Sequence, residues 1–319
     1  MLYRQFGATD LSVSVICFGP MRFVARQAGD DQQSQTGKRA LSRALERGVN
    51  FIHSSYEYGT RWALGQVLKD HPRRSELHHI IKLPVPDSSD NGRFDSAKFR
   101  LRVEEALRDL HAERIAVLQY MQRADPNTDQ LRIPQIKAVR EAMLATFLRL
   151  KAEGKVGYLT TFPYTPGFAA AALATGDYSG MVAYFNPIEM EMIQFFESMQ
   201  ERGMGFLCIR PFMGGLLTDR RIERRRLPGD DRMQAQEWDK PYERLELLKG
   251  TIGTGIDSWT AFAIRFALIH PIVTSLIVGL NTPQQVDEVL DAAEGPFPSR
   301  VVFDQALRVF ETHGMMISH

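Results

Sequence analysis

Short runs of apolar and β-branched residues alternate along the chain with longer segments in which apolar positions recur at helical spacing. The strand-like runs fall at residues 14–18, 49–53, 79–83, 115–121, 156–160, 181–185, 205–209 and 274–279. This alternation is typical of a parallel sheet whose strands are joined by helices.

The segments between these runs carry one-sided apolar patterns. One helix presents an apolar face at Phe99, Val103, Ala106 and Leu110. A second helix presents a similar face, with charged residues filling the gaps, at Ile136, Val139, Met143, Phe147 and Leu150. Pro134 near its start and Gly154 just past its end show the usual asymmetry of proline early and glycine late.

About eight such strand and helix units follow one another without a linker. This arrangement favours the α/β class and a closed (β/α)8 barrel over an open sheet with a second domain, so residues 1–319 are predicted to form one domain. The stretch at about 219–256 is too long for a simple connection, and we predict an inserted loop or lid there with a helix of its own. The next helix should begin near Asp257. In a barrel of this kind, functional residues belong on the loops that follow the strands.

Composition narrows the range of partners. The 319 residues include 39 basic and 38 acidic ones, for a net charge of +1, with 44% hydrophobic and 24% charged residues. A net charge this close to zero gives no strong electrostatic attraction to nucleic acid or to an anionic membrane. The charged fraction is also too ordinary for a disordered chain. A small-molecule substrate is therefore the expected partner. Cys17 and Cys208 lie in apolar runs and predict no disulfide. With no export signal or membrane span in the sequence, we expect a cytoplasmic protein, and its oligomeric state stays open.

The ends of the predicted strands carry polar residues suited to catalysis. His53 ends one strand, Tyr58 follows in the next loop, and Lys82 stands inside the apolar run IIKLP. A lysine buried without a partner is costly, so Lys82 either reaches the barrel mouth or serves a site there. Gln122 closes the fourth strand. No His or Cys spacing resembles a zinc site, and no metal is predicted.

Seven blocks along the chain resemble the aldo-keto reductases, in the order in which that family has them. The blocks are YRQFGATDLSVSVICFG, GVNFIHSSYEYG, the lysine in IIKLP, LKAEGKVGYL, YFNP, GMGFLCIRPFMGGLLT and IVGLNTPQQVDEVL. The resemblance implies an (α/β)8 barrel that holds NADP or NAD at its mouth and reduces carbonyl groups without a metal.

The resemblance also implies which residues are catalytic, and two of the four differ from the family. Tyr58 and Lys82 match the acid tyrosine and its lysine, whereas His53 stands in place of the aspartate and Gln122 in place of the histidine. Without the aspartate, Lys82 should lose protonated character by desolvation and become a candidate base or Schiff-base nucleophile. Glu57 is a candidate substitute for the missing carboxylate.

The cofactor residues implied by the resemblance divide into two groups. The family's nicotinamide contacts are replaced here by Pro20, Phe162, Pro163, Val182 and Ile209. The remaining cofactor pattern is kept, apart from Val289, and assigns nucleotide binding to Asn186, Arg210, Gly214, Gly215, Leu216, Thr218, Gly279, Asn281, Gln285 and Glu288. Positions that contact a 2′-phosphate in the family carry Gly279, Leu280 and Gln285, which leaves NAD and NADP both open.

Arginines offer two places for an anion. The run at 220, 221, 224, 225 and 226 is interpreted as solvated surface, with an anion clamp over the site as the alternative. Arg210, at the end of the seventh predicted strand, is the better candidate because barrel strand ends face the active site.

Three hypotheses about function stay open. The first is an NAD(P)H-dependent carbonyl oxidoreductase with a rebuilt proton relay, in which Tyr58 is the acid, Lys82 its support, His53 a substitute relay and Gln122 an orienting donor. The second is a redox-neutral isomerase, dehydratase or lyase that moves a proton next to a carbonyl group. The third is a non-catalytic member of the fold, against which the retention of Tyr58 and Lys82 speaks mildly.

Overall fold

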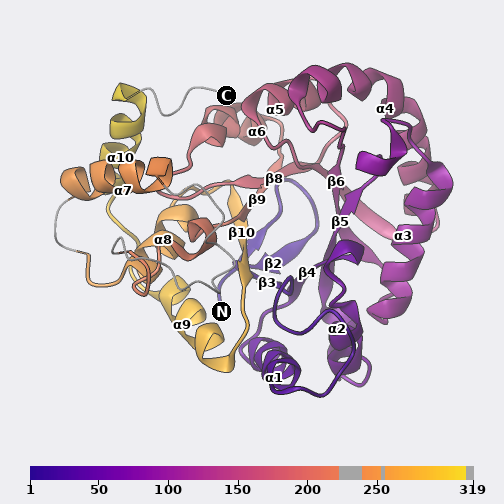
Figure 1. Cartoon of the computed structure of the whole chain (residues 1–319), viewed down its shortest axis with the longest axis horizontal. Helices are drawn as coiled ribbons and strands as arrows, with labels where there is room; N and C mark the ends of the chain where they lie inside the picture. The colour runs from indigo at the N-terminus through magenta and orange to yellow at the C-terminus, as the bar shows by residue number, and fades with distance from the viewer. Residues whose placement is uncertain (223–238, 253–255, 314–319) are drawn as a thin grey trace.

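Eight parallel strands close into a barrel in the computed structural model, which describes residues 1–222, 239–252 and 256–313 (Figure 1). Going around the barrel, the order is β10, β3, β4, β5, β6, β7, β8 and β9. Each predicted run is confirmed as one of these strands: β3 (Ile16–Gly19), β4 (Phe51–Ser55), β5 (His78–Pro84), β6 (Ile115–Met121), β7 (Val156–Thr161), β8 (Gly180–Tyr184), β9 (Gly205–Ile209) and β10 (Val273–Gly279).

Helices surround the barrel, as Figure 1 shows. They are α1 (Gln32–Glu46), α2 (Arg61–Leu68), α3 (Ser96–Asp109), α4 (Asp129–Ala152), α5 (Pro166–Leu173), α6 (Phe196–Glu201), α7 (Asp239–Ile252), α8 (Trp259–Leu268), α9 (Pro283–Glu294) and α10 (Arg300–Thr312). Short 3-10 turns occur at η1 (Tyr56–Tyr58), η2 (Arg74–Glu76), η3 (Ser88–Asp90), η4 (Glu191–Phe195) and η5 (Met213–Gly215). None of the helices in the described part of the chain is both long and apolar enough to cross a lipid bilayer.

The predicted insert at 219–256 contains α7, which packs against α10. Residues 223–238 and 253–255, which include three arginines of the predicted run, lie outside the described residues. The following helix, α8, begins at Trp259 with Ser258 as its N-cap, close to the predicted start near Asp257.

An N-terminal hairpin of β1 (Tyr3–Gln5) and β2 (Ser12–Ser14) covers the end of the barrel where the strands begin. Phe6 follows β1 and packs against the first residues of β8 and β9. Both are glycines, and a Cβ atom at Gly205 would lie 2.3 Å from the Phe6 ring. This close approach requires glycine at both positions. Because the hairpin covers this end of the barrel, the opposite end is left for the site.

The α4 helix begins at Asp129, so Pro134 lies within the helix near its start, as the sequence predicted. A proline this close to the N-terminus removes one main-chain donor early in the helix, where packing of the apolar face outweighs the loss. Gly154 has a φ of +75° just after the C-cap, as the sequence predicted for the helix end.

Alternation along the strands separates two cores. One lies inside the barrel and includes Phe51, Ile80 and Val117, and the other lies between the barrel and the helices. Because side chains alternate in direction along a strand, residues two positions on from these also face inward. This rule places His53, Lys82 and Gln119 in the barrel interior, toward the carboxyl ends of their strands.

Candidate functional site at the mouth of the barrel

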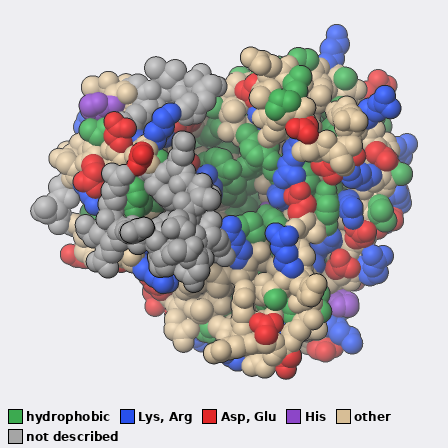
Figure 2. Space-filling model, in the orientation of Figure 1, with side chains coloured by type: hydrophobic (Ala, Val, Ile, Leu, Met, Phe, Trp, Pro, Cys, Tyr) green, Lys and Arg blue, Asp and Glu red, His purple; other side chains and the backbone are tan. Residues whose placement is uncertain are grey.

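The face shown in Figure 2 is hollowed at its centre. Hydrophobic side chains are visible within the hollow, and Lys and Arg side chains stand at its rim. Strand ends and the loops after them contribute the polar groups described below. The site thus combines an apolar interior with charged edges.

Lys82 and Arg123 share one carboxylate at this mouth. The Lys82 Nζ atom lies 2.6 Å from Oε2 of Glu57, and the Arg123 Nη1 atom lies 2.6 Å from Oε1 of the same side chain. Burial lowers the pKa of Lys82, and Glu57 opposes this effect. Although burial alone would raise the pKa of Glu57, its hydrogen bonds to Arg123 and Lys82 hold that pKa below the ordinary value. Glu57 therefore supplies the carboxylate that the strand position of His53 lacks.

Tyr58 lies beside this ion pair. It is the last residue of η1, a turn that ends at Gly59 with a φ of +66° and whose Ser55 N-cap accepts a hydrogen bond from the Glu57 backbone. The Lys82 Nζ atom stands 4.9 Å from the centre of the Tyr58 ring. Burial raises the pKa of Tyr58, Glu57 raises it further, and Arg123 opposes them. Its hydroxyl is consequently protonated at neutral pH, which is the state that an acid catalyst requires.

His53 points into the barrel beneath Lys82. Its Nε2 atom lies 2.7 Å from Oε1 of Gln119, and both side chains are buried. Burial and the nearby charge of Lys82 lower the pKa of His53 to about 4, against the effect of the hydrogen bond that its Nε2–H donates to Gln119. The imidazole is therefore neutral at physiological pH. It does not replace the charge of a carboxylate.

Gln122 does not join this group. Its side-chain nitrogen donates to the backbone carbonyl oxygen of Arg132 in α4, at 2.7 Å, so the amide is held between β6 and that helix. The alternation along β6 explains this direction, because Gln119 and Met121 face inward and the next residue faces outward. The structure thus brings together three of the predicted catalytic residues and holds Gln122 apart from them.

Arg132 is fully buried and fixes the loop after β7. Its guanidinium lies between the rings of Tyr164 and Phe168, 5.0 and 4.7 Å from their centres, and it donates to the carbonyl oxygen of Pro163 at 3.1 Å. Asp129 accepts a further hydrogen bond from it and also one from Thr165. These contacts hold Tyr164 in place, and Arg123 Nε donates to the Tyr164 hydroxyl at 3.0 Å.

The strand end of β9 carries Arg210 in a left-handed conformation, with a φ of +57°. Its guanidinium stacks 4.8 Å from the centre of the Tyr184 ring, and its carbonyl oxygen accepts a hydrogen bond of 3.0 Å from Asn186. Asn186 also donates to Glu189 and accepts from the Ile188 backbone, so it braces the loop after β8. A non-glycine residue in this conformation costs free energy and is often found at functional sites.

The residues present fit the pyrophosphate and adenosine end of a nicotinamide cofactor. At η5, Gly214 and Gly215 have φ values of +67° and +103°, and the Thr218 hydroxyl donates to the carbonyl oxygen of Gly215. At the end of β10, a Cβ atom on Gly279 would meet open space. Nearby, the buried Oδ1 atom of Asn281 has no hydrogen-bond partner among the described residues. An open surface with an unpaired buried acceptor is what a ligand with hydrogen-bond donors needs.

The other predicted nucleotide-binding residues surround these two places. The Oε1 atom of Gln285 accepts a 2.9 Å hydrogen bond from the Asn281 backbone at the start of α9, where Thr282 is the N-cap. Glu288 is exposed on α9, and Leu216 is buried after η5. Gln285 therefore shapes the turn after β10, and Leu216 packs beneath the loop.

The nicotinamide end is lined by hydrocarbon and phenol groups. Phe162 packs edge-on against Tyr164 and Tyr184, with ring centres 4.5 and 5.7 Å away. Val182 is buried below them, and Ile209 is partly buried on the next strand. We refer to Phe162, Tyr164 and Tyr184 as the aromatic wall. In the resemblance, amide side chains at these positions would bind the carboxamide of the nicotinamide. The aromatic wall offers ring edges and hydroxyl groups instead.

Four important residues were not predicted from the sequence. Arg123, Gln119, Tyr164 and Tyr184 contact the predicted site residues, as described above. A period-two count along each strand would have placed Gln119 and Tyr184 inward, but no pattern in the sequence shows that the loop residues Arg123 and Tyr164 turn toward the mouth.

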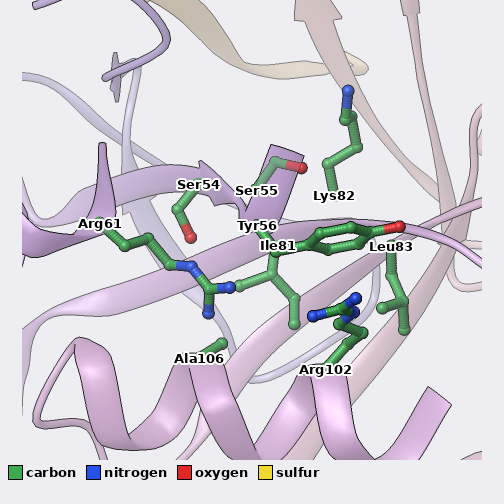
Figure 3. A pocket seen from close by; sticks show the side chains of 9 residues that line it. All are labelled: Ser54, Ser55, Tyr56, Arg61, Ile81, Lys82, Leu83, Arg102 and Ala106. Atoms are coloured by element: carbon green, nitrogen blue, oxygen red, sulfur yellow. The ribbon is translucent and has the colours of Figure 1, made fainter. Parts of the chain in front are cut away.

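A pocket on the other side of the barrel wall shares Lys82 with this mouth (Figure 3). It lies between β4 and β5 and the helix α3, and Arg61, Arg102 and Tyr56 line it. Figure 3 shows Lys82 extending away from these three side chains. Within residues 1–222, 239–252 and 256–313, no three His, Cys, Asp or Glu side chains are gathered as metal ligands.

Comparisons with known proteins agree with this architecture. A model of the Aldo/keto reductase family matches residues 15–304. The chain is 22% identical to an uncharacterized oxidoreductase, YrpG, of Bacillus subtilis, across 92% of this chain and 91% of that protein. It is also 22% identical to L-galactose dehydrogenase of Arabidopsis thaliana, across 89% of this chain and 86% of that protein.

Solved structures show the same fold. The apo form of aldo-keto reductase AKR11C1 from Bacillus halodurans superposes with a TM-score of 0.71 at 22% identity, covering 97% of this chain and 96% of that one. Glycerol dehydrogenase AKR11B4 from Gluconobacter oxydans gives a TM-score of 0.71 at 20% identity, covering 98% and 95%.

Proposed function

Because this chain belongs to the aldo/keto reductase family, we propose that it is an oxidoreductase that reduces a small carbonyl or sugar-like substrate with NADPH or NADH, or catalyses the reverse oxidation. The observation that carries this proposal is the arrangement of Tyr58, Lys82 and Glu57. A protonated tyrosine stands beside a lysine, and that lysine has a carboxylate partner 2.6 Å away. The names of the relatives, an oxidoreductase and two dehydrogenases, support the same reaction class.

The side chains divide the work of carbonyl reduction. A bound nicotinamide would supply the hydride, and its nucleotide end would lie along η5 and the start of α9. The Tyr58 hydroxyl would donate its proton to the carbonyl oxygen, and Lys82 would stabilise the charge left on the phenolate. Glu57 keeps Lys82 charged against the cost of burial, and Arg123 holds Glu57 in position. His53 and Gln119 form a neutral, hydrogen-bonded pair in the barrel interior.

A direct test combines cofactor binding with a matched set of variants. The purified protein is titrated with NADPH and NADH while nicotinamide fluorescence and thermal stability are followed, and a panel of aldehydes and ketones is then assayed. Tyr58→Phe and Lys82→Met should each lower kcat by about 100-fold or more while cofactor affinity stays the same. The first removes the proton donor, and the second removes the charge that stabilises the phenolate. Tyr56→Phe is the control, since Tyr56 lies behind the barrel wall against Arg102. If neither cofactor binds, the proposal is wrong.

The aromatic wall favours a second candidate, a redox-neutral isomerase, dehydratase or lyase acting next to a carbonyl group. Phe162 and its two tyrosine neighbours offer no amide to hold a nicotinamide carboxamide, and orientation is the main thing that a hydride donor needs from its protein. This candidate predicts turnover without added cofactor that Tyr58→Phe abolishes. Turnover that depends strictly on NADPH or NADH would exclude it.

A further inference from the structure

The reacting carbonyl group has to lie between two places at the mouth of the barrel. In the proposed function the aromatic wall is the place of the nicotinamide, and Tyr58 with Lys82 is the place of the proton donor. A substrate that accepts a hydride from one side and a proton from the other must fill the space between them. Its substituents therefore contact the side chains that span this space.

Arg123 spans the space by direct contacts. Its Nε atom donates to the hydroxyl of Tyr164, a member of the aromatic wall, at 3.0 Å. Its Nη1 and Nη2 atoms donate to the two carboxylate oxygens of Glu57, at 2.6 and 3.3 Å. Lys82 lies 2.6 Å from the same carboxylate and 4.9 Å from the centre of the Tyr58 ring. A continuous series of contacts thus runs from the wall to the proton donor, with Arg123 in its middle.

Arg123 keeps donors and charge for a ligand. A guanidinium has five N–H groups, and the three hydrogen bonds to Tyr164 and Glu57 leave two of them over. Among the described residues, Glu57 is the one carboxylate that pairs with Arg123 or Lys82, so these three side chains together carry a net positive charge. The Arg123 side chain is 20% exposed. A partly buried guanidinium in this state is suited to bind an incoming anion.

The surroundings of Arg123 hold it in one orientation. Tyr164 has a φ of +62°, which is strained for an aromatic residue. The fully buried Arg132 lies 5.0 Å from the Tyr164 ring centre and donates to the carbonyl oxygen of Pro163, so it holds the strained residue in place. The strain is explained if the Tyr164 hydroxyl has to fix the guanidinium of Arg123. A guanidinium fixed in advance loses little conformational entropy when a ligand binds.

We propose that the substrate is a 2-oxo acid, whose carboxylate binds Arg123 while the adjacent carbonyl oxygen accepts the proton of Tyr58. Because only the Glu57 carboxylate separates Arg123 from the lysine beside Tyr58, the anion and the carbonyl group must lie close together in the ligand. Reduction takes a hydride from the nicotinamide and the proton from Tyr58, and the product is a 2-hydroxy acid. This step rests on the proposed function, whereas the carboxylate site at Arg123 stands on its own contacts.

Matched substrates test the charge and its position. Benzoylformate and methyl benzoylformate have the same ketone and differ in charge, and 4-acetylbenzoate carries its carboxylate on the far side of the ring. The ester is the more electrophilic ketone, so a preference for the free acid has to come from the protein. We expect kcat/KM for benzoylformate to exceed that for each of the other two by about 10-fold or more.

Calorimetry with mandelate, the corresponding 2-hydroxy acid, and with methyl mandelate measures binding without turnover. The titrations use the protein alone and with NADPH, which cannot reduce an alcohol. Mandelate should bind about 10-fold or more tightly than the ester. Arg123→Met should lower the preference for the acid by about 10- to 100-fold in both assays, and Arg123→Lys should keep part of it. Arg39→Met, at an exposed position on α1, should leave the preference unchanged.

Glu57→Gln should act in the opposite direction. An amide competes less strongly than a carboxylate for the Arg123 guanidinium, so mandelate should bind about 3-fold or more tightly to this variant. An arginine that only supported the fold would not gain affinity for an anion when its partner is neutralised. Unchanged or weaker binding of mandelate to Glu57→Gln would overturn the inference, and this result does not depend on whether Arg123→Met folds.

The outcomes separate this inference from the proposed function. Binding of mandelate that depends on Arg123, in a protein that reduces no carbonyl compound, supports the carboxylate site and refutes the reductase proposal. Reduction of benzoylformate and its ester at equal rates, unchanged by Arg123→Met, supports the reductase and refutes the carboxylate site. If 4-acetylbenzoate reacts as well as benzoylformate, or if Arg123→Met lowers the rates with acid and ester by the same factor, Arg123 does not bind the substrate carboxylate and the inference is wrong.

Discussion

Replacing Glu57 by glutamine removes the carboxylate that Lys82 and Arg123 share while keeping the shape of the side chain. Glu57 lies 2.6 Å from each cation, and the three side chains are 28, 14 and 20% exposed for Glu57, Lys82 and Arg123. In the variant, two partly buried cations would face each other across a neutral amide. The change therefore tests whether Glu57 has taken over the role of the strand carboxylate.

The cost follows from the burial of this network. Exposed ion pairs contribute about 0.2–1 kcal/mol, and removal of one partner from a fully buried pair costs about 3–5 kcal/mol. These side chains are neither fully exposed nor fully buried, so the cost should lie between those two ranges. Glu57→Gln should therefore lower the free energy of unfolding by about 1–3 kcal/mol at pH 7. The exposed pair of Arg73 and Glu76 is the control, and Glu76→Gln should leave that free energy unchanged within error.

The pH dependence of this penalty has a defined sign. The folded-state pKa of Glu57 lies below its ordinary value, so its stabilising effect is present above that ordinary value and is lost as the pH falls through the folded pKa. Burial lowers the folded-state pKa of Lys82, and loss of Glu57 lowers it further. Between the two folded pKa values of Lys82, the variant has lost the proton that the wild type still holds, so the penalty shrinks as the pH rises.

Urea unfolding followed by circular dichroism at pH 4, 7 and 10 measures this profile. The penalty should be largest near neutral pH, and Glu57→Gln combined with Lys82→Met should remove the decline at alkaline pH. In activity assays, the alkaline limb of kcat/KM should move to lower pH, because loss of Glu57 lowers the pKa values of both Lys82 and Tyr58. A penalty that is absent, or constant from pH 4 to 10, would refute the coupling.

Three further predictions concern single side chains. Arg210→Gly should be about 0.5–1 kcal/mol more stable than Arg210→Met in urea unfolding, because both lose the guanidinium but only glycine relieves the φ of +57°; equal stability would contradict this. Arg132→Met should lower the free energy of unfolding by about 2–4 kcal/mol, since it leaves the Asp129 carboxylate without its buried partner, and a loss under 1 kcal/mol would exclude that role. His79 is buried with a pKa lowered to about 4 and becomes destabilising as the pH falls below about 6.5, so His79→Leu should remove about 2 kcal/mol of the stability that the wild type loses between pH 7.5 and 5; unchanged acid sensitivity would show that His79 does not carry it.

The barrel was predictable because each of its strands is a continuous apolar run with its own helix partner. The bounds of β6 agree with the predicted run at both ends, and those of β9 do as well. Lys82 was also predictable as a functional candidate, because a cation inside such a run must reach the barrel mouth or find a partner. These inferences depend only on local sequence and on the alternation of side chains along a strand.

The directions of the loop residues were not predictable. Glu57 turns toward Lys82 because η1 makes a tight turn between Ser55 and Gly59, and several residues in that loop had the chemistry to do so. Gln122 was expected at the site from its position in the resemblance, yet it follows the inward-facing Met121, so it points outward and donates to the carbonyl oxygen of Arg132 in α4. A position in an alignment fixes the place of the backbone, whereas contacts from distant segments decide where the side chain points.

His53 and Glu57 together show how the charge of the site has been rearranged. The strand position holds a neutral imidazole whose partner is Gln119, and the carboxylate that binds Lys82 comes from the loop, four residues later. A loop carboxylate can also reach Arg123, which adds a second cation without adding a second anion. The same change that preserves a partner for the lysine therefore leaves the mouth more positive.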